Sequence, residues 1–165
     1  YLGQDHNDVD ALKHALRQQG VHLLDNSNEH VQANGADLWL IGVDDLMEGT
    51  PDVTGALTGV PVSAGGPLRI LLAHNPDHML EPALHQVDLA FCGHVHGGQI
   101  LIPGVGAIHT QGTHLPRRKP SGWFHYGEAK TYVSRGLGEG IRLRFNCRPE
   151  VAIVQVIRKT SQVTK

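Results

Sequence analysis

LRILLA at residues 68–73 and VDLAFC at residues 87–92 decide the fold. Each is a short and almost continuous apolar run, which is typical of a β-strand that is covered on both faces. A helical stretch around residues 77–85 separates them, so the two runs form one strand, helix, strand unit. The sequence therefore predicts an α/β protein.

The regions on either side are expected to extend this unit into one α/β domain whose later strands form an antiparallel part. The run at 37–43, DLWLIGV, is apolar nearly throughout and predicts another strand buried on both faces. The other expected elements are an amphipathic helix at 8–19, a short strand at 21–24, a hairpin turning at Asn34-Gly35, a long surface connection at 44–67, and strands at 131–134, 141–145 and 151–157.

Histidines follow both central strands. His74 comes after the first strand, and His94 and His96 follow the second within GHVHGGQ. The carboxyl ends of strands in an α/β sheet are where ligands gather, and alternate residues of an extended segment point the same way. Because histidine is the commonest metal ligand, we predict that His74, His94 and His96 converge on a metal site. The alternatives are a glycine-rich turn with hydrogen-bonded histidines and a structural site for one ion.

Longer strings around these histidines resemble the calcineurin-like metallophosphoesterases, and within them a bacterial branch that carries GHTHGGQ. The strings are LWLIGVDD, LLAHNPD, FCGHVHGGQILIP, YVSRGLG and IRLRFNCRPEVAIV, in the same order. The resemblance implies an αββα sandwich of which this chain is an incomplete, C-terminal part. Residues 1–158 would belong to that single domain, and 159–165 would be a polar tail. Gly3-Gln4-Asp5-His6 is expected to be loop rather than one of the family's earlier motifs.

The resemblance also implies a dinuclear metal centre, with His74 and His94 on one ion and His96 on the other. Mn²⁺ is expected first, and Zn²⁺ or Fe are the alternatives, because imidazole suits such borderline metals. Two ions and a metal-bound hydroxide imply hydrolysis of a phosphodiester or phosphomonoester. The bridging carboxylate and the histidine that assists the leaving group would lie upstream of Tyr1. No catalytic side chain is thus identified in this chain, which alone is expected to be inactive.

Two groups of basic residues are candidates for substrate binding. Arg135 could meet a substrate phosphate through its planar guanidinium, and the alternative is a structural ion pair. The cluster Arg117-Arg118-Lys119 could recognise an anionic headgroup, which would suit a phospholipid or glycolipid substrate, and the alternative is a solvated loop. A rival from another class of protein is a catalytically silent member of the family that binds protein partners.

The composition excludes little. The sequence has 14 Lys plus Arg and 16 Asp plus Glu, and the formal net charge of −2 gives no indication of nucleic acid as a partner. Its two cysteines are expected to be free thiols. No apolar run reaches the roughly 20 residues that span a bilayer, and no targeting segment is recognisable. Localisation stays open between the cytoplasm and the periphery of a bacterial inner membrane, and so does membrane association of the parent protein.

Overall fold

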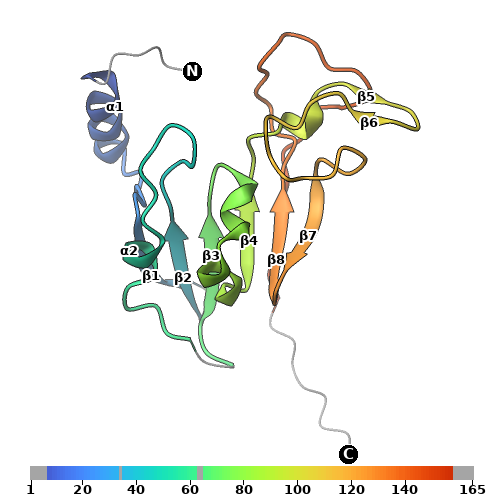
Figure 1. Ribbon diagram of the computed structural model, residues 1–165. Coiled ribbons are helices and arrows are strands. Elements are labelled where there is room, and N and C mark those ends of the chain that lie inside the picture. The colour runs from blue at the N-terminus through green and yellow to red at the C-terminus, as the bar shows by residue number, and fades with distance from the viewer. Residues whose placement is uncertain (1–6, 34, 63–64, 158–165) are drawn as a thin grey trace, which may run out of the picture.

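A computed structural model (Figure 1) describes residues 7–33, 35–62 and 65–157, so the Gly3–His6 motif and the tail at 159–165 lie outside the described residues. Within the described ranges, a six-stranded sheet has the order β1-β2-β3-β4-β8-β7, and β5 pairs with β6 in a separate hairpin. The strands are β1 (Ser27–Ala33), β2 (Ala36–Gly42), β3 (Leu68–Leu72), β4 (Leu89–Cys92), β5 (Leu101–Ile102), β6 (Gly106–Ala107), β7 (Gly122–Tyr126) and β8 (Ala129–Val133). The helices are α1 (Asn7–Gln18), α2 (Val53–Leu57), η1 (Pro76–Leu80), η2 (Pro82–Gln86) and η3 (His96–Gly98).

The central strand, helix, strand unit is confirmed, because β3 and β4 are adjacent and parallel. Two short 3-10 helices, η1 and η2, replace the single helix expected between them. Proline lacks a backbone N–H and clashes with the preceding turn, so Pro82 ends one helical segment and begins the next. Asn75 caps η1 by accepting a 2.9 Å hydrogen bond from the N–H of Asp77. The connection therefore starts immediately beside the expected histidine site.

The flanking elements complete a mixed α/β sheet. β1 and β2 form the antiparallel hairpin expected on either side of Gly35. β8 runs parallel to β4, and β7 pairs with β8 antiparallel, which is the antiparallel part expected late in the chain. α1 is the predicted N-terminal helix, and it is followed by Gly20 with a φ of +77°. Among the described helices, none is both long and apolar enough to cross a membrane.

One face of the sheet carries the main core. The centres of β2, β3 and β4 present Ile41, Leu71 and Ala90, each with 0% of its surface exposed. The helical segments α2, η1 and η2 lie over this face, as Figure 1 shows, and they add Ala56, Met79 and Leu84 to the same cluster. The covered face therefore fixes the strand ends that carry the histidines.

The opposite face is less covered among the described residues. Leu72 on β3 and Trp123 on β7 are each 42% exposed. The prediction that DLWLIGV is buried on both faces was therefore wrong for its first half, since burial becomes complete only from Ile41 onward. The apolar stripe of α1 shows the same openness, because Val9 and Leu12 are 42% and 43% exposed.

Three predicted strands do not form. Residues 21–24, 141–145 and 151–157 lie outside every strand of the structure. A strand is stable only when its backbone groups pair with a neighbour, and an isolated bridge between Ile100 and Phe145 is the pairing that residues 141–145 make. Residues 151–157 have an apolar sequence but are exposed, and 94% of the surface of Ile153 is accessible to solvent. Sequence alone identified their β propensity but not the absence of a partner.

The covered face yields a stability prediction. Ile41→Val removes one methylene from a fully buried position and is expected to destabilise the chain by about 1 kcal/mol. Ile153→Val removes the same group from a 94% exposed side chain and should leave the unfolding free energy unchanged. Urea unfolding of the two variants checks this. Equal losses would show that the apolar segment at 151–157 is buried in solution.

Candidate metal and phosphate site

His74 and His94 meet at the carboxyl edge of the sheet. His74 follows β3 and His94 follows β4, and the N–H of Gly93 donates a 2.9 Å hydrogen bond to the carbonyl of His74, which ties the two strand ends together. Nε2 of His74 lies 3.2 Å from Nδ1 of His94, and the rings are nearly perpendicular, at 82°. The sheet therefore brings together two of the three predicted ligands.

The surroundings of His94 determine which of its nitrogens is free. Its Nε2 lies 3.2 Å from the backbone carbonyl of Gln111. A carbonyl can only accept a hydrogen bond, so Nε2 carries the proton when the ring is neutral, and Nδ1 presents its lone pair towards His74. This is the arrangement common to metal-binding histidines, in which the second ring nitrogen donates to a backbone carbonyl.

The loop that supplies the Gln111 carbonyl is itself held in place. Gln111 has a positive φ of 54°, and its N–H donates a 2.8 Å hydrogen bond to Nδ1 of His109. Thr110 and Thr113 exchange hydrogen bonds across the turn. His109 therefore has a supporting role that the sequence did not indicate.

His96 lies in the turn that follows His94. It opens the short helix η3 with a φ of +49°, two residues after His94. Its ring rests against Gly138, where an added Cβ would be 3.2 Å from Cε1 of the ring. Within the described ranges no three His, Cys, Asp or Glu side chains are arranged to hold one metal ion. His96 is thus near the pair without joining it in one ligand set.

The spacer Val95 points away from the site. It is fully buried in an apolar cluster with Cys92, Leu115 and Val133, as expected for the residue between two ligands. Cys92 and Cys147 are both free, as predicted, and burial raises the pKa of the Cys92 thiol to about 12. The side of the turn facing the core is therefore apolar and uncharged.

Two of the histidines are held in their neutral form. Burial lowers the pKa of His74, and it also lowers the pKa of His96. The carboxylate of Asp45 opposes the shift at His74, since it favours the charged ring. Neutral imidazole is the form that binds metal, so the burial of these rings favours coordination.

Asp45 is a further neighbour of His74, and it lies just after β2. Its Oδ1 does cap the turn, accepting from the N–H groups of Met47 and Glu48 at 2.8 and 3.0 Å. Its Oδ2, however, is buried with no hydrogen-bond partner among the described residues, and its charge is felt by His74. The signal in the sequence was its position just after a buried strand, the same signal that identified His74.

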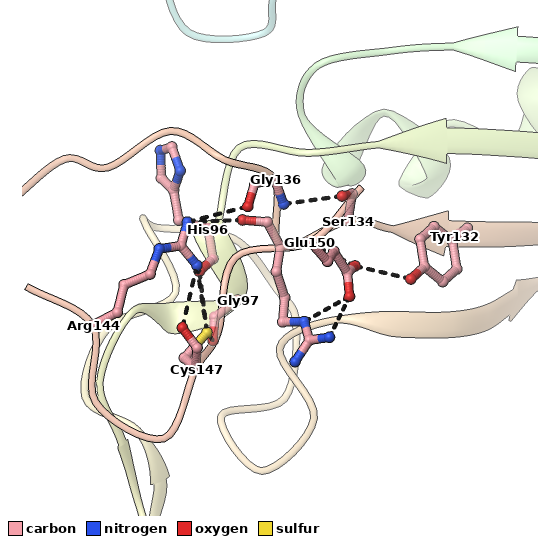
Figure 2. Close-up of polar contacts among 9 residues, drawn as sticks. His96, Gly97, Tyr132, Ser134, Gly136, Arg144, Cys147 and Glu150 are labelled. Atoms are coloured by element: carbon pink, nitrogen blue, oxygen red, sulfur yellow. Dashed lines mark hydrogen bonds and ion pairs between the residues drawn. The ribbon is translucent and has the colours of Figure 1, made fainter. Parts of the chain in front are cut away.

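The basic residues are placed differently from one another. Arg135 forms an ion pair with Glu150, with 2.7 Å between Nε and Oε2, and Glu150 also accepts from the hydroxyl of Tyr132 at 2.9 Å (Figure 2). The charge of Arg135 is thus balanced by Glu150 within the protein, so the binding of a substrate phosphate by Arg135 stays a prediction. Arg118 is exposed and lines a shallow hollow at the β5–β6 hairpin.

The pair His74 and His94 fits a metal ion in its donor chemistry and spacing. Two nitrogens that are each 2.0–2.1 Å from a tetrahedral ion lie about 3.3 Å apart, and the observed separation of 3.2 Å is close to that value. The fit extends to two ligands of one ion, so any further ligands would have to come from outside this pair. Fold and geometry thus define an α/β protein with two histidines in contact at the carboxyl edge of its sheet.

Comparison with known proteins assigns the chain to a family. No family model and no solved structure matches the chain. It is 32% identical to the phosphodiesterase YaeI of Escherichia coli (strain K12) over 142 residues, which is 86% of this chain and 50% of that protein. It is 37% identical to the uncharacterized metallophosphoesterase YkuE of Bacillus subtilis (strain 168), over 73% of this chain and 41% of that protein.

A third relative has a named substrate. The UDP-2,3-diacylglucosamine pyrophosphatase LpxG of Chlamydia muridarum is 31% identical over 72% of this chain and 37% of its own length. The chain belongs to the calcineurin-like metallophosphoesterase family. It spans half or less of the length of these three relatives.

The lowered pKa values of His74 and His96 predict how metal binding depends on pH. A ring whose pKa lies below the ordinary value of roughly 6.5 stays neutral down to a lower pH. Divalent metal binding should therefore be retained at pH 6.5 and lost below it, and excess metal should move the loss to still lower pH. Zn²⁺ titrations of the chain between pH 5 and pH 8 measure this. Loss of binding that begins above pH 7 would contradict the prediction.

Proposed function

We propose that the whole protein is a metal-dependent phosphoester hydrolase, a phosphodiesterase or a phosphatase, in which His74 and His94 hold one ion and His96 a second. The observation that carries the proposal is the 3.2 Å contact between ring nitrogens of His74 and His94 at the ends of adjacent parallel strands. Mn²⁺ is the expected metal, with Zn²⁺ or Fe as alternatives. When bound, two such ions supply a nucleophile at neutral pH and neutralise the charge of the phosphate.

The residues of this chain bind and orient rather than transfer protons. His94 is oriented by the carbonyl of Gln111, which leaves Nδ1 free for an ion. His74 is fixed through its backbone carbonyl and kept neutral by burial. The carboxylate that bridges two ions and the acid for the leaving group are proposed to come from residues that this chain does not contain.

Several features support the proposal that the chain is the C-terminal part of an αββα sandwich. The matched region covers 50% of one relative and 41% of another. One face of the sheet is only partly covered, since Leu72 and Trp123 are each 42% exposed. Val9 and Leu12 of α1 are exposed to the same extent. Apolar surface of this kind is stabilised when another layer covers it. The missing cover would be the first half of the sandwich.

The distribution of charge supports an anionic substrate. Between residues 97 and 148 the acidic residues are Glu128 and Glu139 alone. The basic residues of the same stretch are Arg117, Arg118, Lys119, Lys130, Arg135, Arg142, Arg144 and Arg148. Arg135 is paired with Glu150 and Arg144 is buried, so the other basic residues of this stretch form the basic region that the near-zero net charge of the whole chain conceals. Such a region favours association with phosphate groups.

A phospholipid or glycolipid headgroup is the proposed substrate class. Arg118 lines the hollow at the β5–β6 hairpin together with Ile102 and Pro103, and Ile102 is 40% exposed. A cation beside exposed apolar side chains suits a molecule with an anionic head and an acyl tail. Membrane association of the whole protein would follow from such a substrate.

Metal removal tests the proposed activity. The whole protein, treated with a chelator and freed of it, should lose hydrolysis of bis(p-nitrophenyl) phosphate, and Mn²⁺ should restore it. Two ions per chain are expected by elemental analysis. Ca²⁺ serves as the control, because it prefers oxygen ligands and should restore little. A whole protein that binds no metal and hydrolyses neither this diester nor its monoester would instead be the catalytically silent scaffold.

A further inference from the structure

Arg144 is a buried cation where three loops meet. Its side chain is 7% exposed, and Figure 2 shows its guanidinium between the turn at His96 and the loop at Gly136. Nη1 donates to the carbonyl of His96 at 3.1 Å, and Nη2 donates to the carbonyls of Arg135 and Gly138 at 3.0 and 2.6 Å. One side chain therefore binds the histidine turn to the loop that follows β8.

Backbone carbonyls, rather than a close carboxylate, satisfy this charge. The nearest acidic group, Oε1 of Glu139, is 3.7 Å from Nε of Arg144. This Nε is buried and has no hydrogen-bond partner among the described residues. Taking a charge out of water costs several kcal/mol unless hydrogen bonds replace those of water. The bonds from Nη1 and Nη2 are charge-assisted and offset this cost, so the carbonyls are strongly held.

The carbonyl of His96 belongs to a turn that needs such support. His96 has a φ of +49°, and Gly97, Gly98 and Gln99 continue the run of positive φ values. A non-glycine residue in this region is strained by roughly 1–2 kcal/mol and is kept there by its surroundings. Besides Arg144, the thiol of Cys147 donates to the same carbonyl at 3.4 Å. The segment at 144–147 thus fixes the backbone of His96.

The same guanidinium also fixes the wall behind the His96 ring. The ring packs on Gly138, and the carbonyl of Gly138 accepts the 2.6 Å bond from Nη2 of Arg144. We propose that Arg144 is the positioning residue of His96: it holds both the backbone of that histidine and the peptide group on which its imidazole rests. This inference rests on the proposed function, in which His96 binds a metal ion.

Histidine ring spectra of this chain test the proposal without any turnover. In ¹H–¹⁵N spectra, with His96 assigned by the variant His96→Gln, Arg144→Ala should move the ring signals of His96 and leave those of His74 in place. Affinity for Zn²⁺ should fall about 10- to 100-fold, as for other residues that orient a ligand. Added guanidinium ion should restore part of that affinity. The matched control is Arg142→Ala, an exposed arginine two residues away, which should change neither.

A lysine variant covers the case in which Arg144→Ala does not fold. Arg144→Lys keeps the charge but cannot reach both the His96 and Gly138 carbonyls, so the His96 signals should still move and Zn²⁺ affinity should still fall. His96 signals that stay in place in a folded Arg144 variant overturn the positioning role. Signals that move, in a chain where Zn²⁺ alters no histidine, overturn the proposed metal site instead.

Discussion

Replacing His96 by alanine is expected to lower the kcat of the whole hydrolase by more than about a hundredfold. Residues that merely orient a metal ligand already cost 10- to 100-fold when they are lost, and His96 is proposed to be a ligand itself. The unfolding free energy should change by less than about 1 kcal/mol, because the ring is partly exposed and the turn backbone is held through its carbonyl. Steady-state kinetics at saturating Mn²⁺, alongside urea unfolding, measure the two effects.

Two control variants separate ligand loss from a general disturbance. His125→Ala removes an exposed histidine of β7 and should leave kcat unchanged. Val95→Thr alters the spacer between the ligands, and because Val95 is fully buried among apolar side chains, the hydroxyl should cost about 1–3 kcal/mol of stability with turnover nearly retained. Wild-type turnover in His96→Ala, together with its loss in Val95→Thr, would reverse the roles assigned to ligand and spacer.

The contact between His74 and His94 could be predicted from the sequence, because the ends of adjacent parallel strands determine it. His74 and His94 each follow a buried strand, and adjacent parallel strands end at the same edge, so their contact follows from the order of β3 and β4. Asp45 follows β2, the next strand in the sheet, and comes close enough for its charge to act on His74 for the same reason. Val95, which lies between His94 and His96 in the sequence, is fully buried in the core.

What the sequence could not predict depends on contacts between distant segments. The alternation rule put His94 and His96 on one face of an extended segment, but both have positive φ values, so the segment is a turn rather than a strand. Arg144 was expected in a strand at 141–145, and its bonds to His96 and Gly138 require a loop instead. No local pattern encodes a guanidinium that donates to a carbonyl some fifty residues away in the chain.

The distribution of charge along the chain, unlike these contacts, can be read from the sequence. The balance of 14 basic and 16 acidic residues gave no indication of nucleic acid as a partner. The acidic residues are concentrated before residue 97, and beyond it the basic ones dominate. Because the electrostatic field acts locally, over about 8–10 Å at physiological ionic strength, the charge near the histidine turn matters more to a phosphate than the total. The net charge of the whole chain is therefore a poor guide to whether a phosphate group binds near that turn.

Gly97→Ala is expected to destabilise the chain and to disturb the histidine turn directly. A Cβ at this position would lie 2.5 Å from Cγ of Arg135 and 2.7 Å from Sγ of Cys147, on a backbone with a φ of +64°. Backbone strain of about 1–2 kcal/mol adds to an overpacking cost of about 1–3 kcal/mol. The unfolding free energy should fall by roughly the sum of these two costs, and urea unfolding of the chain measures it. Metal affinity should fall as well, since Gly97 follows His96 directly.

Gly104→Ala isolates the steric part of this effect. Gly104 has a similar φ of +79°, but an added Cβ there would meet nothing within 4 Å. It should therefore show the backbone cost alone, about 1–2 kcal/mol, and leave Zn²⁺ affinity unchanged. The difference between the two variants measures how tightly Arg135 and Cys147 pack on the histidine turn. Equal destabilisation by both substitutions would mean that these side chains move aside, and that the turn is held less rigidly than its contacts indicate.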